Sequence, residues 1–358
     1  MRLFNNIYHG KRVMVTGHTG FKGSWLSLWL QELGSDVIGM SLSPDSQPNH
    51  WDILGLEIDE HLIDIRDNIK VQQVFHNVQP EIVFHLAAQP LVRRSYQKPL
   101  ETWGTNVMGT VNVLEACRHT KSVRAIVVIT TDKCYENLES TRGYCENDRL
   151  GGHDPYSASK AGSELVAASY RNAFFNTDKS PFLATARAGN VIGGGDWSQD
   201  RLVPDLIRAV AQHEPLEIRS PYATRPWQHV LESLSGYLLL GSRLLNGENS
   251  YAEAWNFGPA NEGNRTVSDV LNKLNSFWPS ICWHFSETPQ PHETMLLYLD
   301  STKAHNRLQW QPVWNFETAI EKTADWYRAS LESGEVISRQ QLIDYATHAA
   351  KIKATWAS

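Results

Sequence analysis

Two groups of residues have the types and spacing needed for acid–base chemistry. Tyr156 and Lys160 stand four positions apart, so on a helix they share one face, one turn from each other. A cation beside a phenol favours the phenolate, which can act as a base. Lowering a tyrosine pKa from about 10 to near 7 takes roughly 4 kcal/mol of differential stabilisation. The same pair also occurs on ordinary amphipathic helices, so this spacing alone does not establish a site.

The second group is a polar run that directly follows an apolar one. The β-branched run 125–129 predicts a strand buried on both faces, and Thr130, Thr131, Asp132 and Lys133 come next. Parallel sheets bind ligands beyond the carboxyl ends of their strands, so these polar residues are expected at a ligand-binding edge. A helix beginning at Pro155 would present the tyrosine and lysine to the same edge. The predicted catalytic residues are Thr131, Asp132, Lys133, Tyr156 and Lys160.

A glycine-rich turn lies where a dinucleotide needs one. A strand is predicted over 11–15, and an apolar pattern at helical spacing runs from Trp25 to Gly34. The glycines between them allow a tight turn and close approach of a pyrophosphate, which the helix N-terminus then faces. The residues assigned to this dinucleotide loop are Gly17, His18, Thr19, Gly20, Phe21, Lys22 and Gly23.

The end of the next predicted strand, 36–40, bears on cofactor choice. It offers Ser41 and Ser43, but neither a carboxylate for a ribose nor an arginine for a 2′-phosphate. We therefore expect NAD rather than NADP, bound with moderate affinity. Asp64, with Ile65, is the candidate to contact the adenine; the alternative for Asp64 is a helix N-cap.

The order of predicted elements indicates the fold. A buried strand over 81–89 places the small residues Leu86, Ala87 and Ala88 where a dinucleotide can lie close, with His85 interpreted as a core histidine. Strands and helices alternate through the first half of the chain, which is typical of an α/β, Rossmann-type doubly wound parallel sheet. We predict an NAD-binding domain over 1–188 plus about 229–258. A smaller, interleaved lobe over 189–228 and 259–358 would bind the substrate.

Composition excludes several other classes of protein. The 358 residues carry a net charge of −6, which does not suggest a nucleic-acid partner. The four cysteines form no Cys-x-x-Cys pair, so neither a zinc site nor a disulfide framework is predicted. No apolar run approaches the ~18 residues of a membrane span. We expect a soluble, cytoplasmic protein without a metal or a membrane partner.

Several strings of residues resemble a known family. The glycine loop, the run 85–88, Asn106 and the Tyr-x-x-x-Lys pair look like the extended short-chain dehydrogenase/reductase family of nucleotide-sugar enzymes. Gly-His-Thr-Gly-Phe-Lys-Gly, the run 189–197 and the run 225–230 narrow the resemblance to the branch that dehydrates CDP-linked glucose. In related 4,6-dehydratases the site threonine is followed by Asp-Glu, whereas here Asp132 and Lys133 follow it.

The resemblance implies a reaction and a role for each residue. Tyr156 would take the sugar O4 proton while NAD accepts the C4 hydride, with Thr131 orienting the hydroxyl. Lys133 would then remove the C5 proton, Asp132 would protonate the departing C6 hydroxyl, and the hydride would return to C6. The resemblance adds Asn106 and Thr130 to the cofactor-binding residues. It also implies a homo-oligomer, either a dimer or a dimer of dimers.

The nucleotide diphosphate requires cations in the cleft. Arg225 is the best candidate, although a salt bridge between lobes is the alternative for it, and Trp227 is more readily a core residue than a base-stacking one. The predicted substrate-binding residues are Gln89, Asn190, Arg201, Arg225, His229 and His292.

Two other functions fit parts of the pattern. A nucleotide-sugar 4-epimerase would share the tyrosine and lysine, and so would a dehydratase of another nucleotide sugar. A redox-sensing module would keep the dinucleotide fold without turnover. Such a module has no need for Thr131, Asp132, Lys133, Tyr156 and Lys160 together, so their joint presence favours an enzyme.

Overall fold

A seven-stranded parallel sheet forms the centre of the computed structural model, which describes residues 1–140, 142–177, 180–260, 263–286 and 296–358. Its strand order is β11-β6-β5-β4-β1-β2-β3, so chain order reverses between β1 and β4. Ligands of doubly wound sheets bind at that reversal. The strands are β1 (Arg12–Thr16), β2 (Asp36–Ser41), β3 (Asp59–Leu62), β4 (Ile82–His85), β5 (Ala125–Ile129), β6 (Phe182–Ala188) and β11 (Ala254–Phe257). The doubly wound α/β prediction is confirmed.

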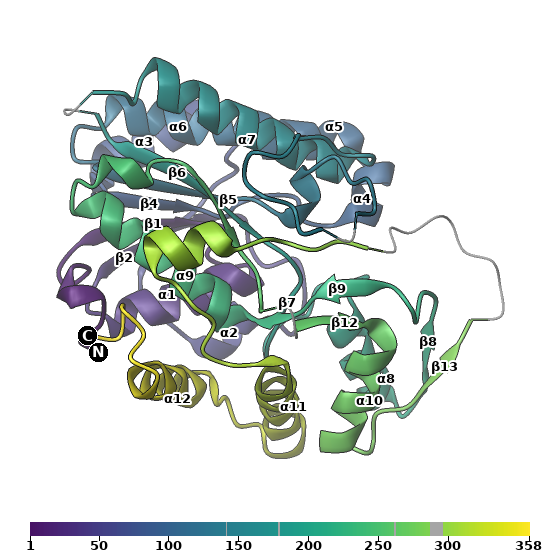
Figure 1. Cartoon of the computed structure of the whole chain (residues 1–358). Helices are drawn as coiled ribbons and strands as arrows, with labels where there is room; N and C mark the ends of the chain where they lie inside the picture. The colour runs from purple at the N-terminus through teal and green to yellow at the C-terminus, as the bar shows by residue number, and fades with distance from the viewer. Residues whose placement is uncertain (141, 178–179, 261–262, 287–295) are drawn as a thin grey trace.

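Helices cover both faces of this sheet because its strands are apolar on both sides. Along β5, Val127 packs into one core, whereas Ile126 and Val128 pack into the other. Figure 1 shows the resulting layers, with one group of helices above the sheet and another below it. The upper group includes α3 (Asn68–Val78), α6 (Gly109–His119) and α7 (Pro155–Ala173), and the lower includes α1 (Phe21–Glu32), α2 (His50–Leu54) and α9 (Val230–Leu245).

Helix α9 is buried on all sides. Fifteen of its 16 residues are buried, because it lies between the sheet and the C-terminal helices. At Gly236 an added Cβ would lie 2.3 Å from the Phe257 ring, so only glycine allows this approach. The chain then enters β11, which pairs with β6 from Ala254↔Thr185 to Phe257↔Ala188. Segment 229–258 therefore returns to the sheet, as expected from the sequence.

The smaller lobe is built from short strand pairs and two helices. β9 pairs antiparallel with β12, while β7 with β10 and β8 with β13 are parallel pairs. A capping box between Thr266 and Asp269 begins α10. The lobe contains β7 (Val191–Ile192), α8 (Leu202–Gln212), β8 (Leu216–Ile218), β9 (Thr224–Pro226), β10 (Gln228–His229), β12 (Asn264–Thr266), α10 (Val267–Phe277) and β13 (Trp283–Phe285).

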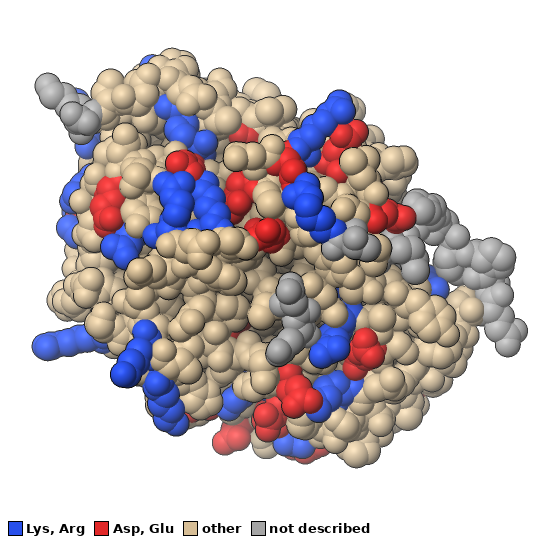
Figure 2. All heavy atoms as spheres, viewed as in Figure 1, with Lys and Arg blue, Asp and Glu red and all other residues tan. Residues whose placement is uncertain are grey.

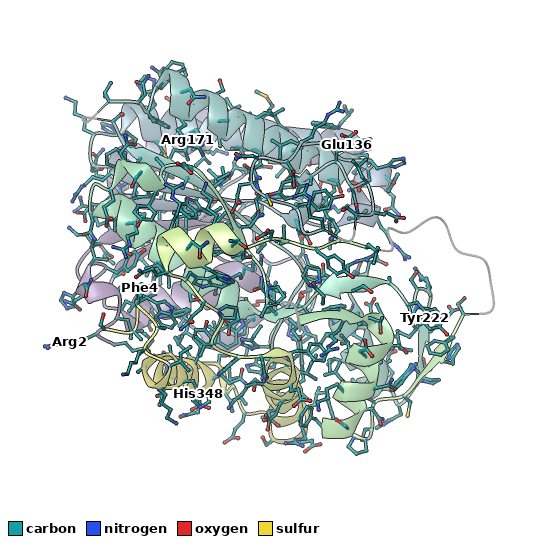
Figure 3. The ribbon with its side chains drawn as sticks, viewed as in Figure 1. Arg2, Phe4, Glu136, Arg171, Tyr222 and His348 are labelled. Carbon is teal, nitrogen blue, oxygen red and sulfur yellow. The ribbon has the colours of Figure 1, made fainter. Side chains whose placement is uncertain are left out.

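The position of the last helix differs from the predicted division into lobes. The chain ends in α11 (Phe316–Ser333) and α12 (Ser338–Lys351), and the sequence predicts both in the substrate lobe. In the structure α12 packs on α1, where the Tyr345 and Trp29 rings meet edge-on at 5.7 Å. Phe4, labelled in Figure 3, stacks on Trp356 at 5.3 Å, which joins the two ends of the chain. The C-terminal segment thus closes the lower layer of the sheet.

Strand β3 was missed by the sequence analysis. It is an edge strand with the sequence Asp-Glu-His-Leu, and three of its four residues are exposed. Charged residues protect exposed edges from pairing with other chains, and they also remove the apolar alternation that marks a strand.

The face shown in Figure 2 and the described helices bear on the possible partners of the protein. On the face in Figure 2, acidic and basic side chains are interspersed. No helix in the described parts of the chain has the length and apolar character needed to cross a membrane. The same residues contain no cluster of three His, Cys, Asp or Glu side chains that could hold a metal.

Candidate active site

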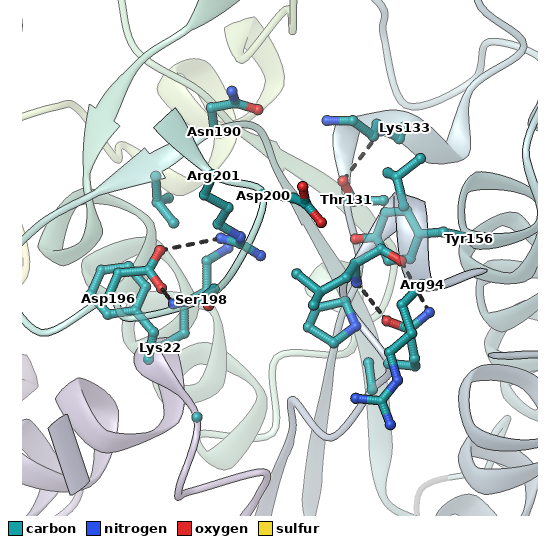
Figure 4. Close-up of a pocket in the computed structure, with 18 of the residues that line it drawn as sticks. Lys22, Arg94, Thr131, Lys133, Tyr156, Asn190, Asp196, Ser198, Asp200 and Arg201 are labelled. Carbon is teal, nitrogen blue, oxygen red and sulfur yellow. Dashed lines mark hydrogen bonds and ion pairs between the residues drawn. The ribbon is translucent and has the colours of Figure 1, made fainter. Parts of the chain in front are cut away.

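A large cleft runs along the carboxyl ends of the strands. Its volume is about 2000 Å³, twice the upper end of the usual range for a site that holds one small molecule, about 1000 Å³. It therefore has room for two ligands side by side. Figure 4 shows Thr131, Lys133 and Tyr156 on one wall, with Lys22, Asp196, Arg201 and Asn190 on the other.

The glycine loop forms one end of this cleft, and its geometry fits a dinucleotide. Gly17 adopts a φ of +76°, and a Cβ there would lie 2.8 Å from the Ala87 backbone. A Cβ at Gly23 would lie 2.0 Å from the Gly17 carbonyl oxygen, so α1 can approach the turn only with glycine at this place. The N-terminus of the 12-residue α1 faces the cleft, as pyrophosphate binding requires. Gly17, Thr19, Gly20, Phe21, Lys22 and Gly23 all line it.

Lys22 brings a cation from this loop to the centre of the cleft. Its Nζ donates to the Tyr237 hydroxyl at 3.2 Å. The pKa of Lys22 is lowered to about 7, first by burial and then by the positive charges of Arg201 and Lys160, while the acids Asp132 and Asp196 act in the opposite direction. Its charge therefore depends on which ions share the cleft.

His18 is the exception within the loop, because its side chain does not line the cleft. The ring is fully buried, with Nε2 2.8 Å from Glu60 Oε1 and its edge against Trp51. Burial lowers its pKa although Glu60 acts in the opposite direction. The expectation that His18 contacts the cofactor is therefore wrong for its imidazole, which packs beneath the loop on the β2 side.

The neighbouring loops supply the adenosine end of the cleft. Ser41 Oγ lies 2.8 Å from Thr19 Oγ1, which also donates to the Leu42 carbonyl. Asp64 and Ile65 line the cleft, but the Asp64 carboxylate is paired with Arg66 and does not cap a helix. The N-cap of α3 is instead Asp67, so that alternative for Asp64 is wrong.

Strand β4 delivers small residues to the cleft and a histidine to the core. Leu86, Ala87, Ala88 and Gln89 line the cleft as predicted. His85 lies between the hydroxyls of Thr16, at 2.7 Å, and Thr110, at 3.1 Å. Burial lowers the pKa of His85 to about 3, which fits the core interpretation.

Asn106 supports the cleft from behind rather than lining it. Its Oδ1 accepts from the Gln89 amide at 2.8 Å, and its Nδ2 donates to the Gln89 carbonyl and to Ser159 Oγ. The Asn106 side chain is buried and is not part of the cleft wall. The expectation that Asn106 contacts the cofactor is therefore wrong, and the residue instead supports the Gln89 backbone. The side-chain amide of Gln89 in turn donates to the Leu91 carbonyl oxygen and to Thr102 Oγ1.

The polar run after β5 forms a compact turn, a 3-10 helix over Asp132–Cys134. Thr131 Oγ1 donates to Asp132 Oδ1 at 2.9 Å and accepts from the Lys133 amide at 3.3 Å. Lys133 Nζ lies 3.9 Å from the same carboxylate. Asp132 is buried, yet its Oδ2 has no hydrogen-bond partner among the described residues. A buried carboxyl oxygen without a partner is costly, so it is suited to meet a ligand group.

Tyr156 and Lys160 project from α7 beside this turn, as the spacing predicts. Burial raises the pKa of Tyr156 to about 12, whereas the Arg201 charge and the Thr131 hydrogen bond act to lower it. Burial lowers the pKa of Lys160 to about 8, opposed by Glu164. The phenol thus departs from the expected lowered value, chiefly because it is buried. Lys160 Nζ donates to the Ile129 carbonyl at 3.1 Å, and the cation that acts to lower the pKa of the phenol is Arg201.

Three predicted substrate residues line the opposite wall. Arg201 lies 3.6 Å from Asp196, and Arg225 is largely buried with one nitrogen donating to the Thr224 carbonyl. Asn190 also faces the cleft. Trp227 borders it but is buried and bonded to Arg265, in accord with a packing role.

His229, also predicted to bind substrate, is not part of this wall. The His229 ring is fully buried against Trp25 and Trp314, and its Nδ1 accepts from the Leu231 amide. Burial lowers its pKa to about 3. Substrate contact by His229 is therefore wrong; the residue caps and anchors α9. His292 lies outside the described residues.

The structure also adds cleft residues that the sequence analysis did not select. They are Arg93 and Arg94 on α4 (Val92–Gln97), and Asp196, Ser198 and Asp200 on the loop before α8. Asp196 and Ser198 fall within or beside the run 189–197, which was the available signal. Arg93 and Arg94 carried none, because paired arginines are common on exposed helices.

Comparisons with known proteins agree with this geometry. The profile of a family described as GDP-mannose 4,6 dehydratase matches residues 14–323. The chain belongs to this family. It is 46% identical over 349 residues to the CDP-glucose 4,6-dehydratase of Salmonella typhimurium, which covers 95% of this chain and 97% of that protein.

Solved structures of similar fold include both dehydratases and epimerases. An epimerase from Methanothermobacter thermautotrophicus matches with a TM-score of 0.82 and 25% identity, over 94% of this chain and 96% of that chain. The dTDP-glucose 4,6-dehydratase of Bacillus anthracis, in complex with NAD, matches with a TM-score of 0.74 and 20% identity over 90% and 98%. The second likeness shows the fold alone.

Proposed function

We propose that this protein catalyses the NAD-dependent dehydration of CDP-D-glucose to CDP-4-keto-6-deoxy-D-glucose. The observation that carries the proposal is the buried Asp132 carboxyl, in the same cleft as Tyr156 and Lys133, with one oxygen that has no hydrogen-bond partner in the described part of the chain. Oxidation alone needs only the tyrosine, whereas elimination of water needs a second acid–base pair. The 46% identity to a curated CDP-glucose 4,6-dehydratase supports this reaction and the cytosine base.

The first step belongs to Tyr156. As the phenolate it removes the proton from the sugar O4, and the Thr131 hydroxyl orients that oxygen. Bound NAD supplies a hydride acceptor at C4 and a hydride donor at C6. Lys160, Gly17 and Gly20 would hold it, since they line the cleft and the loop fits a pyrophosphate. The Arg201 charge and the Thr131 hydrogen bond favour the phenolate against the burial that raises its pKa to about 12.

The second step belongs to Asp132 and Lys133. A ketone at C4 acidifies the C5 hydrogen, so Lys133 can remove it as a base. Asp132 donates a proton to the C6 hydroxyl as water leaves. The 3.9 Å between Lys133 Nζ and Asp132 Oδ1 supports action on neighbouring sugar atoms, C5 and C6. The hydride that leaves C4 returns to C6, and Lys133 gives a proton back to C5, so the reaction is redox-neutral overall and loses only water.

The substrate diphosphate is held on the opposite wall. Arg225 and Arg201 supply the positive charge, with Asn190 donating to a phosphate or to the hexose. The product would enter deoxysugar biosynthesis, including that of O-antigen lipopolysaccharide. A charged, freely diffusing substrate agrees with the cytoplasmic location expected from the sequence.

The test compares four substrates. The purified protein, supplied with NAD, is incubated with CDP-, UDP-, GDP- and dTDP-glucose, and the ultraviolet absorbance that 4-keto-6-deoxy sugars develop in alkali is measured. We expect that signal with CDP-glucose above all. Product from another of the four nucleotide sugars alone would show that the protein prefers a nucleobase other than cytosine. Formation of a galactose epimer without the alkaline signal would favour a 4-epimerase.

We further propose that the protein forms a homodimer through its upper helical layer. Large apolar side chains are exposed on adjoining elements there: Leu100, which is 88% exposed, and Trp103 on α5 (Pro99–Trp103), Met108 on η2 (Gly104–Met108) and Leu165 on α7. A contiguous apolar patch of this kind marks an interaction surface. Sedimentation velocity should show a dimer that Leu100→Glu with Leu165→Glu converts to monomer; a wild-type monomer would contradict this.

A further inference from the structure

A buried ion pair behind the catalytic turn has no part in the steps above. Glu164 lies one turn beyond Lys160 on α7, and its side chain is almost fully buried. Its carboxylate accepts hydrogen bonds from Thr130 Oγ1, from Thr185 Oγ1 at 2.7 Å and from Arg187 Nη2 at 2.8 Å. Three donors around one carboxylate hold it in a fixed place, and they lower the pKa of Glu164 against its burial.

Arg187 extends this pair to the segment that follows the catalytic turn. Its Nη1 donates to the Tyr135 hydroxyl at 2.7 Å and to the Glu146 carbonyl at 3.0 Å, and its guanidinium stacks over the Tyr135 ring. The Tyr135 hydroxyl donates in turn to Asn256 on β11. The ion pair thus joins α7, β6 and β11 to the residue that directly follows the turn Asp132–Cys134.

The residues that lead into the catalytic turn are held by one helix. Lys160 Nζ donates to the Ile129 carbonyl, and Glu164 accepts from Thr130 Oγ1, so consecutive turns of α7 hold consecutive residues at the end of β5. Thr131, Asp132 and Lys133 come next. The same helix carries Tyr156, so these contacts determine where the second acid–base pair lies relative to the first.

Stability alone does not require this arrangement. The desolvation of a buried ion pair offsets most of its attraction, and well-packed apolar side chains of similar volume are often at least as stabilising. A misplacement of catalytic groups by ~1 Å, by contrast, can lower a rate by about 10²-fold.

We propose that Glu164 and Arg187 are a positioning pair for the elimination step, acting through Thr130 on the Asp132–Lys133 turn. The inference rests on the proposed dehydratase function. It assigns no contact with substrate or cofactor to either residue. Loss of the pair should impair the chemistry at C5 and C6 more than the oxidation at C4.

Two matched variants test the proposal with the full-length protein. Thr130→Val and Thr185→Val each remove one hydroxyl that donates to the same carboxylate, but only Thr130 adjoins the catalytic turn. Thr130→Val should lower kcat by roughly 10- to 100-fold with KM within about twofold, and slow exchange of the C5 hydrogen with deuterated water by a similar factor. Thr185→Val should change both by less than about threefold, with a similar loss of thermal stability.

A second pair of variants reads the charge of Glu164. Glu164→Gln removes the negative charge that raises the pKa of Lys160, so the alkaline limb of the kcat–pH profile should move to lower pH. Glu232→Gln is the control, since Glu232 is equally buried on α9 but bonds Val313, Trp314 and Tyr345 away from the cleft. Both changes should lower the unfolding temperature, and only Glu164→Gln should move the profile.

The outcomes separate the inference from the function on which it rests. If the wild-type protein forms no 4-keto-6-deoxy product, the proposed function fails. If the wild type turns over but Thr130→Val matches Thr185→Val in exchange rate, and Glu164→Gln matches Glu232→Gln in pH profile, the pair is structural only. If Glu164→Gln fails to fold, the comparison of Thr130→Val with Thr185→Val decides, because both of these variants keep the Glu164 carboxylate.

Discussion

Arg93 Nη1 lies 2.8 Å from Asp200 Oδ1, and this ion pair connects the two walls of the cleft. Arg93 comes from α4, beside the dinucleotide half, and Asp200 from the loop that leads into α8 of the smaller lobe. Both residues line the cleft, so the pair spans its mouth. Ligands that enter or leave must pass residues that this contact draws together.

Removal of this ion pair should have a small and salt-sensitive effect. Both side chains are about half exposed, and exposed ion pairs contribute roughly 0–1 kcal/mol. Arg93→Ala should therefore change KM for CDP-glucose by no more than about fivefold with kcat nearly unchanged. In the wild type, raising the salt concentration should shift KM in the same direction, and the variant should lack that response. A drop in kcat beyond tenfold would mean that Arg93 contacts a ligand instead.

Tyr156→Phe should abolish turnover with little effect on binding. The phenol is the base at O4, and loss of a positioned base costs about 10²-fold or more in kcat. Substrate affinity, measured by calorimetry, should stay within about threefold. Near-normal turnover would move the base for O4 to another residue.

Arg201→Met should test Tyr156 as the base through the pH dependence of kcat/KM. Burial raises the pKa of Tyr156, and Arg201 is the strongest influence that lowers it. The active form is the phenolate, so activity rises with pH until the phenol is ionised. Without the Arg201 charge the pKa of Tyr156 rises further, and the rising limb of the kcat/KM profile should move to higher pH. An unmoved limb would show that another group titrates there.

Asp132→Asn and Lys133→Ala should separate elimination from oxidation. Neither change touches the O4 base, so both variants should still show the near-ultraviolet absorbance of reduced nicotinamide when substrate is added. Asp132→Asn cannot protonate the C6 hydroxyl, and Lys133→Ala cannot remove the C5 proton, so product should fall by about 10²-fold or more. Lys133→Ala should also slow C5 exchange with deuterated water. Normal 4-keto-6-deoxy product from both variants would make the pair structural and assign the acid and base of the elimination to other residues.

Acidification should destabilise the fold through three buried histidines. Burial lowers the pKa values of His50, His85 and His229 to about 3. A lowered folded-state pKa contributes stability that is present above the unfolded value of about 6.5 and is lost as the pH falls below it. Each histidine should remove up to about 1.4 kcal/mol per pH unit between ~6.5 and ~3. Denaturant unfolding at pH 7 and 5 measures this, and His50→Gln should reduce the slope.

The elements that position the chemistry were predictable because their signals are local. Each signal acts on the backbone of the residues that carry it: the apolar run of β5, the proline at the start of α7 and the glycines before α1. Tyr156 and Lys160 then share one face by helix geometry alone.

Side-chain destinations were less predictable, because their partners lie far away in the sequence. His18 turns to Glu60, Asn106 to the Gln89 backbone, and His229 to two tryptophans, and each is drawn away from the cleft by that partner. The pKa of Tyr156 also differs from the expectation, chiefly because the phenol is buried by packing that local sequence does not reveal. Lys160 is occupied by the Ile129 carbonyl, and the cation that acts on the phenol comes from residue 201.

The return of the chain to β11 has a consequence for how the molecule is made. During synthesis, residues 1–188 emerge first and carry six of the seven strands, but α9 and β11 follow only with residues 230–257. Until then the lower face of β5 and β6 lacks its apolar cover, and the edge of β6 lacks its neighbour. An open edge of this kind pairs readily with other chains. A chain that ends before residue 258, through ribosome stalling or truncation, should therefore be prone to aggregation and should not fold as an independent nucleotide-binding domain.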